Sequence, residues 1–250
     1  MYSRSFSLSI VCLGVTMFCS MAPAFGQGRP HEGMVLVAPL VGWNRNELRI
    51  QGPPGMPPAT LTETAAEYGV FAMYFSPRVV ANNMLFFTHV NDADVWGDFA
   101  FLNVYGAPEA RCTWNAGAGY LWHRISPDIA DIEITVPMVK AGLVVRVPGV
   151  KLMLNPYLAY AWEKVDTDFG DEETESVLYG LSARWRWRMV RLTLKYYLED
   201  NRDRDEQYNT LRARATVALR RNMGISARLE HMEHSVSDNT SFLIGPGFIF

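Results

Sequence analysis

The chain has 250 residues, of which 49% are hydrophobic and 20% charged, and its formal net charge is −3. This size and balance are typical of one large globular domain or two small ones. The small acidic excess argues against a nucleic-acid-binding protein, because such proteins usually carry a basic excess.

The first 26 residues differ from the rest of the chain. Arg4 is their only charged residue, an apolar run follows from Phe6 to Met21, and residues 22–26 carry small side chains at the spacing of a signal-peptidase site. This combination predicts a cleaved secretory signal peptide over residues 1–26 and an exported domain over residues 27–250. The exported domain retains one cysteine, Cys112, so no internal disulfide is expected. It contains no run of 18 or more apolar residues, and no membrane-spanning helix is expected.

Apolar and polar residues alternate with period two through the exported domain, which predicts β-strands. In VRLTLKYYL, residues 190–198, the apolar side chains lie on one face, and Arg191, Thr193 and Lys195 lie on the other. The pattern predicts twelve strands, at about 34–43, 65–75, 79–90, 98–106, 113–124, 132–147, 150–163, 176–188, 190–199, 207–220, 223–234 and 240–250.

Alternation occurs both in soluble β proteins and in membrane barrels, so other features must separate the two. Most predicted strands have ten or more residues, and about 9–11 are needed to cross a bilayer. The links between strands alternate short and long, and the even count puts both termini on one side, which is periplasmic in bacterial outer-membrane barrels. Aromatic residues on the apolar faces suit interfacial girdles: Trp114, Tyr120, Trp122, Tyr160, Trp162, Trp185 and Trp187. These features favour a transmembrane antiparallel up-and-down β-barrel, with a soluble periplasmic β protein as the alternative.

The C-terminus resembles the assembly signal of bacterial outer-membrane β-barrel proteins. That signal has a Gly, two residues, an aromatic residue, one residue and a terminal aromatic residue, which correspond here to Gly245, Phe248 and Phe250. Leu243 stands where the family usually has a polar residue. The resemblance implies location in the outer membrane of a Gram-negative cell envelope, contact with its lipid and lipopolysaccharide, and recognition by the barrel assembly machinery.

The polar faces of the last predicted strands carry nine basic residues. These are Arg184, Arg186, Arg188, Arg191, Lys195, Arg212, Arg214, Arg220 and Arg228, and Glu199 and Glu230 oppose them on the same faces. Such a row is costly in a dry core and implausible against lipid, whereas a water-filled lumen accommodates it. A basic wall favours anions in a pore, and the lumens of twelve-stranded oligosaccharide-uptake porins resemble this one. We therefore expect a small channel or porin that passes small anionic solutes; the alternative is a lumen plugged by pairing of these residues with acids.

Four prolines fall within the predicted strands, although proline cannot donate to a sheet ladder. Pro39 and Pro246 lie on the two strands that close the barrel, and Pro137 and Pro156 lie on one hairpin. One interpretation is bulges that curve the barrel. The other is a lateral gap to lipid, which would resemble the palmitoyl-transferring lipid A enzymes, although none of their catalytic motifs is present.

No catalytic, cofactor-binding or metal-binding residue is assigned. Outer-membrane lipid-modifying enzymes place His and Ser close together, and the nearest matches, His234 with Ser235 and His123 with Ser126, do not share a strand face. The sequence therefore favours a non-enzymatic role and leaves a lipid-modifying enzyme open. Acidic links such as DTDFGDEETE, residues 166–175, match no calcium-binding loop and suit a structural barrel that acts through its external loops.

Overall fold

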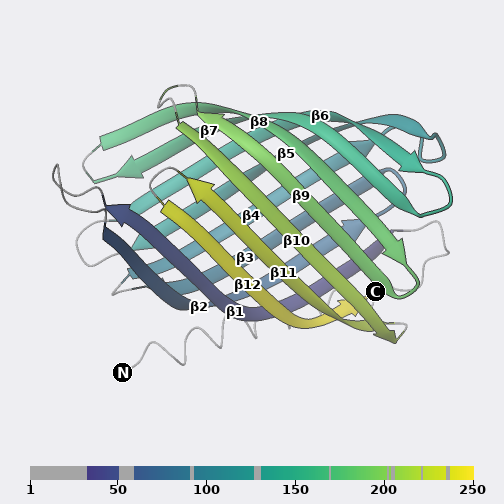
Figure 1. Cartoon of the computed structure of the whole chain (residues 1–250), viewed down its shortest axis with the longest axis horizontal. Coiled ribbons are helices and arrows are strands. Elements are labelled where there is room, and N and C mark those ends of the chain that lie inside the picture. The colour runs from purple at the N-terminus through teal and green to yellow at the C-terminus, as the bar shows by residue number, and fades with distance from the viewer. Residues whose placement is uncertain are drawn as a thin grey trace.

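The computed structural model describes residues 33–50, 59–90, 93–126, 131–168, 170–201, 203, 206–220, 222–234 and 237–250. These residues form twelve antiparallel strands that close into a barrel, in which successive strands are neighbours and β12 pairs with β1 (Figure 1). The strands are β1 Met34–Ile50, β2 Ala59–Phe75, β3 Val79–Val90, β4 Ala93–Tyr105, β5 Cys112–Ser126, β6 Ile132–Val147, β7 Leu152–Thr167, β8 Gly170–Trp187, β9 Val190–Asn201, β10 Glu206–Arg220, β11 Met223–His234 and β12 Ser237–Ile249. The predicted all-β, twelve-stranded barrel is confirmed, whereas the predicted signal peptide lies outside the described residues.

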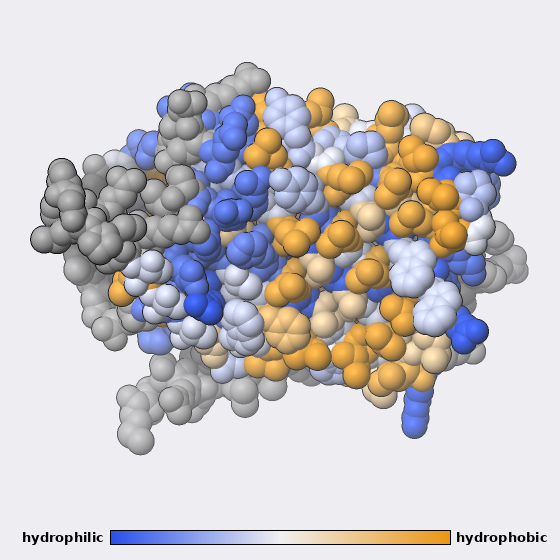
Figure 2. All heavy atoms as spheres, viewed as in Figure 1, coloured by the Kyte–Doolittle hydropathy of each residue, from blue (hydrophilic) through white to orange (hydrophobic). Residues whose placement is uncertain are grey.

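Successive side chains of each strand point alternately out of the barrel and into its lumen. On β9, Leu192, Leu194 and Tyr196 are exposed, and Lys195 between them points inward. Figure 2 shows the result on one face: apolar side chains cover its middle and much of its right half, and hydrophilic side chains gather at the left, toward the end where β1 finishes, and along the right edge. A barrel with apolar side chains outside and charged ones inside is the inverse of a soluble β protein and suits a lipid surrounding. Within the described residues, no helix is long and apolar enough to cross a membrane.

The strands run further than the sequence pattern predicts, reaching 18 residues in β8. The acidic stretch 166–175, expected as a loop, is mostly strand: β7 continues to Thr167, β8 begins at Gly170, and Asp166 pairs with Asp171. The reason is that both faces of these extensions are hydrated, so apolar residues stop alternating while backbone pairing continues. The extensions form a polar collar at the end of the barrel opposite the chain termini. Because they lengthen the strands, the links between strands differ less in length than predicted.

The seam between β1 and β12 is in register but lacks part of its ladder. Val35 and Phe250 exchange two backbone hydrogen bonds of 3.1 and 2.9 Å, which secure the C-terminal residue. In the same register Pro39 stands directly opposite Pro246, at a position that would also exchange two bonds, and the pairing resumes only at Val41 and Ile244. Because neither proline has an N–H, both bonds are missing.

The prolines therefore do not mark bulges. Neither the β1–β12 pairing nor the β6–β7 pairing around Pro137 and Pro156 shifts register, and the one shift recorded in the described pairings lies between Ala218 and Arg220. The seam is also not spread apart, because a Cβ added to Gly245 would collide with the carbonyl oxygen of Pro39. The barrel is closed there by packing of two backbones without their hydrogen bonds.

Candidate functional site

The lumen has a basic wall on β8–β11 and an aromatic wall on β2–β4, and the two walls touch. The guanidinium carbon of Arg214 lies 3.6 Å from the ring centre of Phe71, and that of Arg191 lies 4.6 Å from the ring centre of Phe75. The strands that carry these partners are not neighbours in the barrel, so the contacts cross its interior. Two further pairs of this kind are Arg212 with Phe99 at 5.5 Å and Arg184 with Tyr105 at 5.8 Å. Cation–π attraction therefore links the walls.

An ion-pair cluster, Arg212–Glu230–Arg228, lies among these contacts. Arg212 and Glu230 are directly opposite on β10 and β11, and the guanidinium donates to both carboxylate oxygens, at 2.7 and 2.6 Å. Arg228 donates to the same carboxylate, and its other amino group contacts the sulfur of Met84 across the lumen. The three charged side chains are only 13–17% exposed. The cluster holds two positive charges against one negative charge and narrows the lumen.

A basic vestibule opens on the side of this cluster that is nearer the chain termini. It is a cavity of about 270 Å³ that includes Ser76 and Pro77 of the turn between β2 and β3. Its charged lining residues are Arg146, Arg184, Arg191, Lys195 and Arg214, and no carboxylate lines it in the described part of the chain. An unbalanced group of basic side chains around one cavity creates a positive local potential that attracts anions. The sequence pattern missed Arg146 because its neighbours from Leu143 to Val147 in β6 are otherwise apolar.

The lumen toward the polar collar has a different chemistry. Glu67 is buried there and accepts a hydrogen bond from Asn44, which in turn accepts one of 3.2 Å from Asn239. Amide and hydroxyl groups such as those of Asn201 and Thr174 continue this layer. The lumen is thus basic at one end and neutral or acidic at the other, with the ion-pair cluster between them.

The structure places most of the nine predicted basic residues in the lumen but separates two from it. Arg188 lies in the turn between β8 and β9, in a left-handed conformation with φ of 48°, over the ring of Trp187. Arg220 is exposed at the rim, next to the register shift that reverses the alternation at the end of β10. Both differ from the expected positions because a tight turn and a bulge interrupt the period of two. The remaining seven are Arg184, Arg186, Arg191, Lys195, Arg212, Arg214 and Arg228, with Arg186 at the exposed rim.

Two histidines considered as catalytic bases lie in aromatic contacts. His123 points into the lumen and meets the edge of Phe86, with ring centres 5.2 Å apart, and Ser126 lies on the opposite face of β5. His234 stacks on Tyr208 at 4.2 Å, and Ser235 is outside the described residues. Among the described residues, no group of three or more His, Cys, Asp or Glu side chains could hold a metal ion.

Solved structures resemble the barrel as a whole. The translocator domain of the autotransporter NalP from Neisseria meningitidis aligns over 98% of this chain and 97% of its own, with a TM-score of 0.52 and 15% identity. The fold is that of bacterial outer-membrane β-barrels. This barrel also aligns, with lower TM-scores, to the β domain of the Bordetella autotransporter BrkA (0.47, 13% identity, 85% of this chain and 98% of that one) and to an anion-selective porin from Comamonas acidovorans (0.39, 10% identity, 88% and 100%). No protein-family model and no curated protein matches the chain.

The outer surface of this outer-membrane-type barrel has an apolar zone with aromatic residues at its edges and a polar collar beyond it. The predicted girdle residues point outward, among them Trp114, Trp162 and Trp187 with 41–54% exposure. Charged pairs begin beyond the apolar zone, in the collar. One is Arg124 with Asp131 at 2.5 Å, and this hydrogen bond lowers the pKa of Asp131. Apolar zone, aromatic residues and polar collar follow one another along the barrel as they would across a bilayer interface.

Proposed function

We propose that this protein is an outer-membrane channel that captures small anionic solutes in its basic vestibule and passes them through a narrow middle. The observation that carries the proposal is the group of five basic side chains around one cavity of about 270 Å³, which no carboxylate of the described residues lines. Such a site concentrates anions, and Arg can hold a carboxylate or phosphate with two hydrogen bonds. Export through a signal peptide, periplasmic termini and insertion by the barrel assembly machinery belong to the same proposal.

Selectivity would arise at two places along the path. The vestibule lies at the end of the short turns and the termini, which we assign to the periplasm, and it would set the preference for negative charge. The ion-pair cluster follows, and there a solute must pass Arg212 and Arg228, which share a single carboxylate. A translocating anion could replace Glu230 as their partner, so the narrow middle would discriminate against cations as well.

The test is single-channel conductance of the refolded chain in a planar bilayer under a salt gradient. We expect steady current steps and a reversal potential on the anion side. Charge reversal in the vestibule, Arg184→Glu with Arg191→Glu, should move the reversal potential toward cations. The matched control is Arg188→Glu, which makes the same kind of charge reversal in an exposed turn and should leave the reversal potential unchanged. Equal shifts in both variants would contradict a selective vestibule.

A closed barrel that acts through its polar collar is the second candidate, and the cation–π contacts across the lumen favour it. Arg214 and Phe71 are close enough to block the path between the walls. Under this candidate the folded wild-type barrel is electrically silent, and Phe71→Ala with Arg214→Ala opens it. Silence in both proteins, with the folded barrel verified by its faster migration unheated than boiled on a gel, would rule out a channel and leave the collar as the functional surface.

A further inference from the structure

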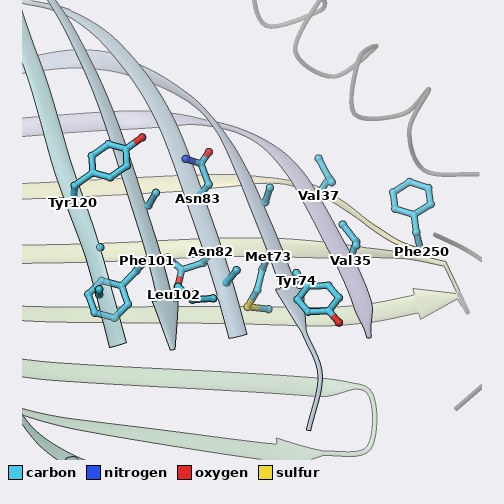
Figure 3. Close-up of a pocket in the computed structure, with 15 residues that line it drawn as sticks. Val35, Val37, Met73, Tyr74, Asn82, Asn83, Phe101, Leu102, Tyr120 and Phe250 are labelled. Atoms are coloured by element: carbon cyan, nitrogen blue, oxygen red, sulfur yellow. The ribbon is translucent and has the colours of Figure 1, made fainter. Parts of the chain in front are cut away.

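A groove of about 640 Å³ lies on the outer wall of the barrel, over β1–β5, separate from the lumen. It is hollow because four successive strands place small side chains on their outward face: Ala72, Ala81, Ala100 and Ala118. Larger side chains border it. Figure 3 shows Tyr120 and Asn83 toward one end and Val37 and Phe250 toward the other, all rising from the same side of the sheet.

Asp98 lies at the Tyr120 end of this groove and points outward, toward lipid. It comes two residues before Ala100 on the outward face of β4, and it accepts hydrogen bonds from Asn83 at 2.6 Å and from Tyr120 at 2.5 Å. Both partners are neutral, and both belong to the wall of the groove. A carboxylate has acceptor sites for about four hydrogen bonds, so Asp98 can accept more donors.

The depth of Asp98 is unusual for a carboxylate that points out of the barrel. On the outward face of β4, Leu102 and Ala100 lie on its one side and Trp96 on the other, and two residues of strand span about 7 Å. The carboxylate is therefore within the apolar zone, just beneath its aromatic edge. A charged group that faces lipid is unfavourable and marks a functional site unless an opposite charge pairs with it, and both partners of Asp98 named above are neutral.

We propose that the groove binds a membrane lipid whose acyl chain lies over the alanines and whose chain base carries a hydroxyl or amide N–H that donates to Asp98. The apolar hollow matches a hydrocarbon chain, and the anionic acceptor at its end matches a donor just below the headgroup. A second copy of the barrel is a poorer occupant, since its outer wall is convex. It would not fill the hollow.

Two lipids that differ only in this donor test the proposal. Sphingomyelin and phosphatidylcholine share the phosphocholine headgroup, but only sphingomyelin has an amide N–H and a hydroxyl at the base of its chains. Native mass spectrometry of the folded barrel in detergent, titrated with each lipid at matched chain length, gives the two affinities. A hydrogen bond to a charged acceptor supports a preference of about tenfold for sphingomyelin in the wild type.

Three variants test whether the lipid binds in the groove or elsewhere on the outer wall of the barrel. Asp98→Leu should bind both lipids equally, and it should unfold at a higher urea concentration because a carboxylate leaves the apolar zone. Ala100→Trp fills the groove and should weaken the binding of both lipids. Ala183→Trp places the same side chain at an outward alanine of β8, three strands away from the groove strand β5, and should bind as the wild type does.

The proposal is overturned if the wild type binds the two lipids equally, or if Ala100→Trp and Ala183→Trp behave alike. It is also overturned if Asp98→Leu retains the preference for sphingomyelin. A dimer that Ala100→Trp dissociates would assign the groove to a second copy instead. Each variant is first verified as folded by its migration on unheated gels, so loss of binding is not confused with loss of the barrel.

Discussion

Replacing Glu230 by Gln removes the single negative charge of the Arg212–Glu230–Arg228 cluster without changing the size of the side chain. Arg212 and Arg228 would then face each other without a counter-ion, at side-chain exposures of 17% and 13%. At an effective dielectric constant near 20, two charges about 4 Å apart interact by about 4 kcal/mol. Breaking a buried pair by removing one partner costs about 3–5 kcal/mol, so we expect the free energy of unfolding to fall by that amount.

The assay is reversible urea unfolding of the refolded barrel in lipid vesicles, followed by tryptophan fluorescence. Glu173→Gln is the matched control, because it makes the same chemical change on an exposed position of the collar and should stay within about 0.5 kcal/mol of the wild type. Adding Arg228→Gln to Glu230→Gln removes one of the two cations left without a counter-ion and should restore about 1–2 kcal/mol of the free energy of unfolding.

The size of this loss also reports on the state of the lumen. If Glu230→Gln costs under about 1 kcal/mol, the pair is screened as an exposed salt bridge is, and the middle of the lumen is filled with water rather than with packed side chains. That outcome would refute the narrow middle inferred from the contacts of Arg212 and Arg228. It would also remove the physical basis for a second selective position beyond the vestibule.

The closing seam and the topology give further predictions. Pro39→Val with Pro246→Val restores two N–H donors at facing positions, so the unfolding free energy should rise by about 1 kcal/mol per hydrogen bond in the same urea assay; no gain would mean that the backbones cannot approach to bonding distance. Gly245→Val should prevent folding, seen as loss of the fast-migrating band on unheated gels, because its Cβ meets the Pro39 carbonyl; a folded variant would contradict the close packing of the seam. Cys112 is exposed at the terminus end of the barrel, so a membrane-impermeant maleimide should label it only after the outer membrane of intact cells is permeabilised; labelling without permeabilisation would reverse the proposed orientation.

The sequence determined how many strands the barrel has and which face of each strand meets lipid. The reason is that a strand has a period of exactly two side chains, so LTLKYYL alone assigns Leu194 to one face and Lys195 to the other. The sequence pattern failed where the period of two is interrupted or where both faces of a strand are hydrated. Arg188 and Arg220 fall at a tight turn and a register shift, and the acidic stretch 166–175 continues as strand because hydrated pairing leaves no apolar signal.

Only the tertiary structure decided which residues meet across the lumen and around the wall. Alternation gives the face of a residue but not its height in the barrel, since height depends on strand tilt and on the register fixed when β12 joins β1. That register sets Pro39 opposite Pro246 and brings Arg214 onto the ring of Phe71. Each of these contacts joins segments that are distant in sequence, so no local pattern encodes it, and closure of the sheet creates them together.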